Sequence, residues 1–404
     1  MKSKILVSIF LPVLACAATK CLSGQTQFWS TLEAGPHAVG FRTFYLRDTL
    51  RRWEASITPD AAPDLGRPIR VSLWYPATAS GGSEMRYGDY FHYDGPPDFR
   101  SLNDTLERSD RLSWLDDLTE ETPNGRVVAD SLFAMPVAAR HDAPAADGRF
   151  PVILYSGGKG SRADANVELG EYLASYGYVV VTVPQLGPSA QDLELGSSPS
   201  DIMLHVRDLA FAWKAVRKLS FVDTVRLAVA GHSSGGVVAL QFAMLYLGVR
   251  AVVGLDGSYG MFGEGGQRES HRTPIRDFPA FDSDHFTAPL LDLRRANGVQ
   301  GAELDSTVVA DLRSSDRYVI TLPRMYHGDF TEWAPLAVRL DVPWPTGADG
   351  RTRQSALDGN QHAYRAILDF FSATLQGSSG GITAMIRELQ ALDGVTVVHK
   401  PVLR

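Results

Sequence analysis

The fold of this chain is decided by one stretch, residues 225–245, which reads VRLAVAGHSSGGVVALQFAML. Residues 225–230 are typical of a buried strand, and residues 234–247 are typical of a helix. Between them, Gly231-His232-Ser233-Ser234-Gly235 matches the pattern G-x-S-x-G, in which a serine protrudes at a sharp strand-to-helix turn. The flanking positions must be small because a Cβ there would collide with the backbone. The pattern predicts that Ser233 is a nucleophile; the alternative is a glycine-rich turn without catalytic function.

On both sides of this stretch, short β-branched runs alternate with longer amphipathic segments, which predicts βαβ units on a mainly parallel sheet. Because the runs are apolar throughout, we expect strands that are covered on both faces. The expected strands are residues 151–155, 178–183, 225–230, 251–255, 289–293 and 318–322. The expected helices are residues 162–176, 201–219, 234–247 and 361–375. Residues 39–46 and 68–75 predict an antiparallel start of the sheet.

Two insertions interrupt this α/β pattern. Residues 78–150 are polar, lack clear periodicity and are expected to cover part of the sheet. Residues 257–287 join two strands, and so long a connection inside a compact domain usually has a function. Phe262, Phe278, Phe281 and Phe286 lie in this connection; they either shape a confined acyl pocket or pack the loop onto the body.

The chain accordingly divides into three parts. Residues 1–24 are read as a signal peptide, residues 25–378 as the catalytic domain, and residues 379–404 as a C-terminal extension.

A serine hydroxyl is a poor nucleophile at neutral pH and needs a base. His327 lies on the loop that follows the expected strand 318–322, where a base would reach the carboxyl edge of the sheet. His232, inside the turn, and His362, on the last helix of the domain, are interpreted as structural.

The acid that orients the base has more than one candidate. Asp256 ends the strand that follows the nucleophile's helix, so its side chain would emerge at the catalytic edge. Asp305 follows the next strand by a loop and is the main rival, and Asp292 lies inside a strand and is weaker. A helix cap or a solvated loop carboxylate is the alternative for Asp256 and Asp305. We favour Asp256.

A tetrahedral intermediate needs two donors for its oxyanion. One is expected from the N–H of Ser234, directly after the nucleophile. The other is expected from the loop Ser156-Gly157-Gly158-Lys159-Gly160, where the Lys159 N–H is the best placed. The loop lacks the spacing of a phosphate-binding G-x-x-x-x-G-K-[ST], and no dinucleotide or metal-ligand pattern is found. We expect no cofactor.

The N-terminus has the layout of a secretory signal. Lys2 and Lys4 precede an apolar run that is too short to span a bilayer, and small residues follow. Both cysteines of the chain, Cys16 and Cys21, lie here. The sequence around Cys16 loosely resembles a lipoprotein cleavage site, so secretion and a lipid anchor both stay open, and the anchor would be the only link to a membrane. Export predicts a periplasmic, extracellular or envelope-bound protein.

Charge argues against nucleic acid as a partner. The 39 basic and 46 acidic residues give a net charge of −7, and they are interspersed without a basic stripe.

These motifs together resemble the branch of α/β hydrolases that contains platelet-activating-factor acetylhydrolases and relatives of dienelactone hydrolase. The matching pieces are GPHAVG at 35–40, RPI at 67–69, LWYPA at 73–77, PVILYSGGKG at 151–160, GHSSGG at 231–236, LDGS at 255–258, and His327 with Phe330. The resemblance implies an α/β-hydrolase fold, the triad Ser233, Asp256 and His327, and oxyanion donors at Lys159 and Ser234. Gly157 departs from it, since the family often has histidine there, and residues 257–287 do not resemble the family's usual connection.

The sequence therefore predicts an exported serine hydrolase that cleaves small carboxylic esters, short-acyl or acetylhydrolase-like, through an acyl-enzyme. The alternatives are a catalytically silent binding protein of the same fold, or a peptidase or thioesterase.

Overall fold

The computed structural model describes residues 29–53, 65–161, 165–190, 192–196, 198–259, 261–262, 275–278, 280–299, 303–304, 307–342 and 350–403. The expected signal peptide with both cysteines, and Asp305, lie outside these residues. So does much of the connection 257–287.

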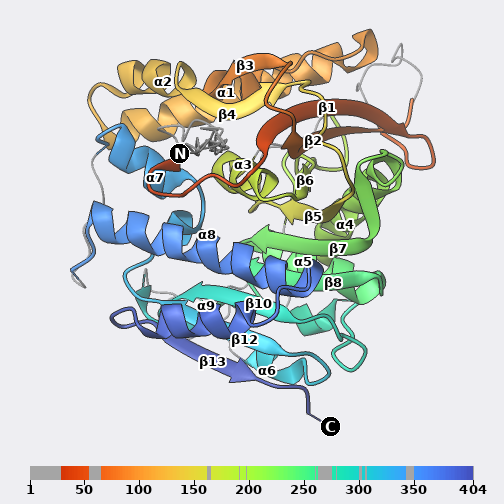
Figure 1. Ribbon diagram of the computed structural model, residues 1–404. Helices are drawn as coiled ribbons and strands as arrows, with labels where there is room; N and C mark the ends of the chain where they lie inside the picture. The colour runs from red at the N-terminus through yellow and green to blue at the C-terminus, as the bar shows by residue number, and fades with distance from the viewer. Residues whose placement is uncertain are drawn as a thin grey trace, which may run out of the picture.

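An eleven-stranded sheet forms the centre of the protein. Its order is β13-β12-β10-β8-β7-β5-β6-β2-β1-β4-β3, running from β13 at the bottom of Figure 1 to β3 near the top. The strands are β1 (Ala38–Asp48), β2 (Arg67–Ala77), β3 (Ser83–Arg86), β4 (Pro136–His141), β5 (Phe150–Ser156), β6 (Val179–Thr182), β7 (Val222–His232), β8 (Val249–Leu255), β10 (Leu290–Arg295), β12 (Arg317–Leu322) and β13 (Thr396–Lys400). A separate small ladder pairs β9 (Met261–Phe262) with β11 (Glu303–Leu304).

The middle of the sheet is parallel, as the sequence predicts. Each neighbouring pair from β12 through β10, β8, β7 and β5 to β6 runs in the same direction. The start of the sheet is antiparallel, because β1 pairs antiparallel with β2, and β2 with β6. The carboxyl ends of the parallel strands therefore meet at one edge, where the loops that carry the candidate residues begin.

Helices cover both faces of the sheet and explain why its central strands are apolar throughout. In β5, Ile153 packs in one core with α3 and α8, and Val152 packs in the other with α4 and α5. The helices of the domain are α3 (Val167–Ser175), α4 (Pro199–Val216), α5 (Ser234–Leu245), α6 (Thr307–Asp311), α7 (Trp333–Arg339) and α8 (Arg353–Leu375). Figure 1 shows α8 crossing in front of the sheet.

The polar insertion 78–150 contains more regular structure than its sequence suggests. It forms α1 (Arg100–Glu121), α2 (Gly125–Phe133) and the strands β3 and β4, and β4 joins the sheet beside β1. The tail, for which the sequence gives no role, also joins the sheet. It forms α9 (Gly381–Gln390) and then β13, which pairs antiparallel with β12 as the outermost strand.

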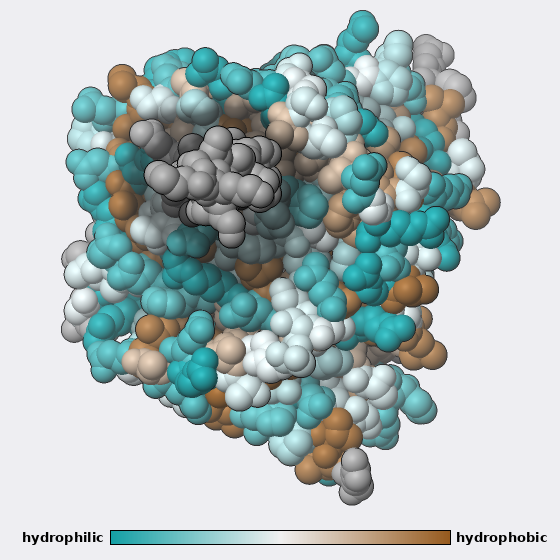
Figure 2. Space-filling view, viewed as in Figure 1, coloured by the Kyte–Doolittle hydropathy of each residue, from teal (hydrophilic) through white to brown (hydrophobic). Residues whose placement is uncertain are grey.

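The visible surface is mixed in character. In Figure 2, apolar residues are scattered in small groups among polar ones, outside the grey atoms. Among the described residues, no helix combines the length and the apolar character that a membrane span requires.

Candidate active site

Ser233 occupies a strained turn between β7 and α5. Its backbone has φ 56° and ψ −125°, a conformation that L-residues rarely adopt and that functional sites often hold. A Cβ on Gly231 would lie 2.0 Å from the carbonyl oxygen of Gly235, and one on Gly235 would lie 2.1 Å from the carbonyl oxygen of Ser156. The strand–turn–helix context that the motif requires is therefore present, and both glycines are needed for close packing.

His327 and Asp256 are joined by a short hydrogen bond. His327 begins a 3₁₀ turn (His327–Phe330) after β12, and Asp256 directly follows β8. Nδ1 of His327 lies 2.5 Å from Oδ2 of Asp256. Because a carboxylate only accepts, Nδ1 carries the proton in this bond and Nε2 is left with a lone pair. This is the tautomer that a general base needs.

Arg295 holds the Asp256 carboxylate from the other side. The Arg295 N–H donates to Oδ1 at 3.2 Å, and Nε of Arg295 lies 3.1 Å from Oδ2. Burial is the largest influence on the Asp256 carboxyl and opposes its ionisation. The hydrogen bond from His327 and the positive charge of Arg295 outweigh burial, so the pKa of Asp256 falls below its ordinary value. Asp256 is therefore a carboxylate.

His232 connects the nucleophile turn to the base. Its Nε2 lies 2.9 Å from the main-chain carbonyl oxygen of His327, and the two imidazole rings are 4.6 Å apart between centroids. Ser233 and His327 are thereby brought into one neighbourhood through the residue that precedes Ser233. The sequence identified His232 only as structural and gave no sign of this bond.

The loop after β5 approaches Ser233 through Gly158. A Cβ built on Gly158 would lie 3.2 Å from Cβ and 3.7 Å from Oγ of Ser233. On another side, Oγ of Ser258 lies 3.4 Å from Oγ of Ser233. Lys159, the next residue of the loop, directs its side chain to Glu194 at 3.3 Å, which leaves only its main chain for an oxyanion.

Ser234 is the first residue of α5. The N–H groups of the first turn of a helix have no intrahelical acceptor, and the helix dipole adds positive character there. The Ser234 N–H is thus suited to an oxyanion.

The rival acids differ in position. Asp292 is buried within β10 and forms an ion pair with Arg294. Burial raises the pKa of Asp292, against the lowering influence of Arg294. Asp305 lies outside the described residues. Of the acids considered, the structure places Asp256 on His327. His362 lies half-buried on α8.

The phenylalanine rings of the connection 257–287 are candidates for the walls of an acyl pocket, and the structure shows where three of them lie. Phe278 and Phe286 are buried in the core beside α5, and Phe281 packs against the same core. Their burial supports the alternative that these rings attach the loop to the body. The side chain of Phe262 lies outside the described part of the chain.

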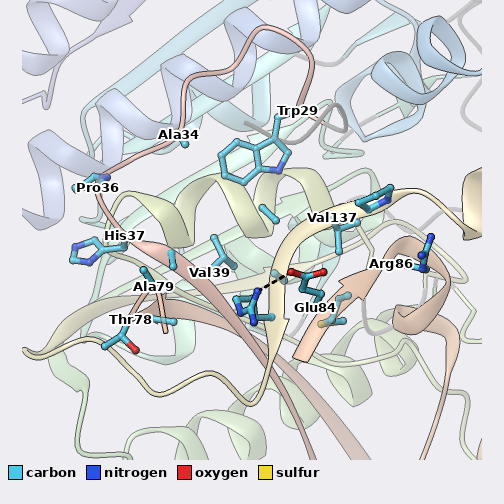
Figure 3. Close-up of a pocket in the computed structure, with 17 residues that line it drawn as sticks. Trp29, Ala34, Pro36, His37, Val39, Thr78, Ala79, Glu84, Arg86 and Val137 are labelled. Carbon is cyan, nitrogen blue, oxygen red and sulfur yellow. Dashed lines mark ion pairs between the residues drawn. The ribbon is translucent and has the colours of Figure 1, made fainter. Parts of the chain in front are cut away.

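A large cavity lies elsewhere on the protein. It has a volume of about 1000 Å³ and is lined by the segment before β1 and by β1, β3 and β4, including Trp29, His37 and Arg86. Figure 3 shows the Glu84–Arg140 ion pair within it. Its lining contains none of the predicted site residues. Across the described residues, no group of three or more acidic, histidine or cysteine side chains is arranged to hold a metal ion.

Comparisons with known proteins agree with this fold. The family model described as Chlorophyllase matches residues 126–269, a segment that contains Lys159, Ser233 and Asp256. A solved structure of a ferulic acid esterase from Streptomyces cinnamoneus has a TM-score of 0.58 and 21% sequence identity, and covers 91% of this chain and 98% of that chain. No curated protein matches.

Proposed function

Because this chain is a member of the α/β-hydrolase superfamily, we propose that it hydrolyses carboxylic esters with Ser233 as nucleophile, His327 as base and Asp256 as the orienting acid. The observation that carries the proposal is the 2.5 Å bond from His327 Nδ1 to the buried Asp256 carboxylate, beside a serine held in a strained turn. Nucleophile, base and orienting acid are the parts that acyl transfer requires.

The proposed reaction has two halves. Oγ of Ser233 attacks the ester carbonyl and gives its proton to Nε2 of His327. Asp256 stabilises the imidazolium, and the N–H groups of Ser234 and Lys159 bind the oxyanion. Collapse expels the alcohol, which takes the proton from His327, and leaves an acyl-serine. Water, activated by the same histidine, then releases the acid.

Labelling with a fluorophosphonate tests the nucleophile, because only an activated serine reacts. We expect the wild type to be labelled on Ser233 and Ser233→Ala to be unlabelled, with turnover reduced by about 10⁴ to 10⁶. Ser131→Ala is a matched control, since Ser131 is exposed on α2 and donates to the Val127 carbonyl. A wild type without labelling or ester turnover would instead favour the silent binding protein.

We propose short acyl esters as the preferred substrates. Support comes from the limited space around Ser233: Ser258 Oγ lies 3.4 Å from its Oγ, and a Cβ on Gly158 would lie 3.2 Å from its Cβ. p-Nitrophenyl esters from acetate to palmitate test this, with methyl ferulate and chlorophyll added because of the similar proteins. We expect a maximum at about two to six carbons, since each buried methylene contributes about 0.8 kcal/mol until the pocket ends. A rate that rises through to palmitate would contradict the preference.

We also propose that the protein is exported after removal of residues 1–24. The expected product is an unlipidated chain that begins near Gln25, as measured by intact mass of the exported protein from a bacterial host. Cys16→Ser should export the same product. If this variant changes the mass or releases the protein from membranes, the chain is lipid-anchored through Cys16.

A further inference from the structure

The turn that carries His327 is short, and it combines hydrogen bonds of its own with hydrogen bonds from other elements. Within it, the Asp329 N–H donates to the Tyr326 carbonyl at 3.1 Å, and the Thr331 N–H donates to the Gly328 carbonyl at 3.1 Å. Side chains from other elements bind its remaining carbonyls. His232 binds that of His327 at 2.9 Å, and Asn360 of α8 donates to that of Asp329 at 2.9 Å. Bonds from other elements therefore help to hold the turn in its position.

His232 is the donor with the most direct link to the reaction. It is covalently bonded to Ser233, so its bond to the His327 carbonyl connects nucleophile and base through one residue and one hydrogen bond. The imidazole also borders the oxyanion loop, because a Cβ on Gly158 would lie 3.3 Å from its Nδ1. His232 is thus linked to the nucleophile through the main chain, to the base through a hydrogen bond, and to the neighbourhood of the oxyanion loop through its ring.

The protonation of His232 suits this role. A carbonyl oxygen only accepts, so Nε2 must carry the proton. Burial, and then the neighbouring His327, lower the pKa of His232 to about 3, against the opposing influence of Asp256. The ring therefore stays neutral and keeps the same donor at neutral and mildly acidic pH.

We infer that His232 is a positioning residue that fixes the distance between Ser233 and His327 by donating from Nε2 to the His327 carbonyl. This inference rests on the proposed function and extends it. A base displaced by about 1 Å can lose about 10²-fold in rate.

A pair of amide substitutions tests the inference. In His232→Gln, the side-chain nitrogen reaches about the position of Nε2 and can replace the donor. In His232→Asn, it reaches only about the position of Nδ1. We expect His232→Asn to lower kcat about 10²-fold with KM within about twofold of wild type, and His232→Gln to recover kcat to within about fivefold. The rate of fluorophosphonate labelling should follow kcat.

His205→Asn is the matched control. His205 is a second fully buried histidine, on α4, and burial lowers its pKa to about 4. This variant should keep kcat within about twofold of wild type. Thermal unfolding of all three variants separates positioning from stability, because a merely structural role would lower the melting temperature and leave kcat of the folded fraction unchanged.

Equal kcat in His232→Asn and His232→Gln, in a wild type that labels normally, would overturn the inference and leave the proposed function intact. Failure of the wild type to label would overturn both. The acid side of log kcat/KM against pH should have a slope of one in wild type and His232→Gln. A slope of two in wild type would mean that His232 also titrates with the base, which would contradict a permanently neutral donor.

Discussion

Replacing Gly158 by alanine tests the geometry around Ser233 with a single methyl group. The added Cβ would lie 3.2 Å from the Ser233 Cβ, 3.3 Å from Nδ1 of His232 and 3.7 Å from Oγ of Ser233. Its backbone φ is outside the left-handed region, so the substitution brings contact without conformational strain. Either the loop or Ser233 and His232 must therefore shift by a few tenths of an ångström to admit the methyl group.

The size of the effect follows from these distances. Carbon atoms pack best at about 3.5–4.0 Å, so Ser233 and the loop must separate by roughly 0.3–0.8 Å. If about 1 Å of misplacement costs about 10²-fold, a shift of about half that size should lower kcat about tenfold. Stability should change little because the loop can yield, with an expected loss of about 1 kcal/mol.

The measurement is kcat and KM for p-nitrophenyl acetate, with the rate of fluorophosphonate labelling as a second readout. Gly248→Ala is the matched control, because a Cβ at Gly248 meets nothing within 4 Å and its φ is likewise outside the left-handed region. Activity of Gly158→Ala equal to that of the control would refute the placement of this loop against Ser233.

Three further predictions concern the acid and the buried titratable groups. In steady-state kinetics, Asp256→Asn should lower turnover by about 10³- to 10⁴-fold, and Asp305→Asn should change it little. The reverse ranking would identify Asp305 as the orienting acid. Burial, followed by the charge of Glu332, raises the pKa of Glu168 well above its usual range, so wild-type stability falls as pH rises through that pKa. Glu168→Gln should remove this loss. In urea unfolding, the difference in stability between Glu168→Gln and wild type should grow with pH by at most about 1.4 kcal/mol per pH unit. Parallel curves of stability against pH for the two proteins would contradict the prediction. His205 has the opposite effect on stability, because its pKa is lowered from 6.5 to about 4. The wild type should lose about 3 kcal/mol of unfolding free energy as the pH falls from 6.5 to about 4, and His205→Asn should not. An equal loss in both proteins would exclude His205 as the source.

The parallel core of the fold could be predicted because its signals are local. Consecutive apolar residues occupy the centres of β5 (residues 151–155), β7 (residues 227–230) and β12 (residues 318–320), and strands covered on both faces have this character. Signals other than periodicity mark the ends of helices. α8 begins at Arg353, eight residues before the predicted start, because a capping box between Thr352 and Ser355 begins it.

The pairing of strands from distant segments could not be predicted from the sequence. β13 has the sequence TVVHK, in which two of the five residues are apolar, and it joins the sheet as the outermost strand beside β12. In the insertion, α1 is mostly polar and buries few side chains, among them Trp114 and Leu118, so its periodicity is weak.

In the candidate site, too, residues with local sequence signals could be predicted, and contacts between distant elements could not. Ser233 has a local motif, and His327 and Asp256 follow strands whose carboxyl ends share an edge, so chain order alone brings them together. The bond from His232 and the ion pair from Arg295 depend on side-chain packing between elements. A buried histidine or arginine can bind many different acceptors in a folded protein. The spacing of residues along the chain does not indicate which acceptor it binds.

The far end of the His327 turn shows why such polar contacts are present. Asp329 and Arg351 form an ion pair with side chains only 1% exposed, and Asp329 also accepts the Tyr326 N–H at 2.7 Å. Removing two charges from water costs several kcal/mol, so a buried pair adds little net stability compared with apolar side chains of similar volume. The directional hydrogen bonds of this pair, however, fix the turn in one orientation. Apolar packing allows a wider range of orientations. Replacing both residues by apolar ones should therefore leave the melting temperature nearly unchanged and lower kcat, because the turn would still be packed but His327 would no longer be held in place.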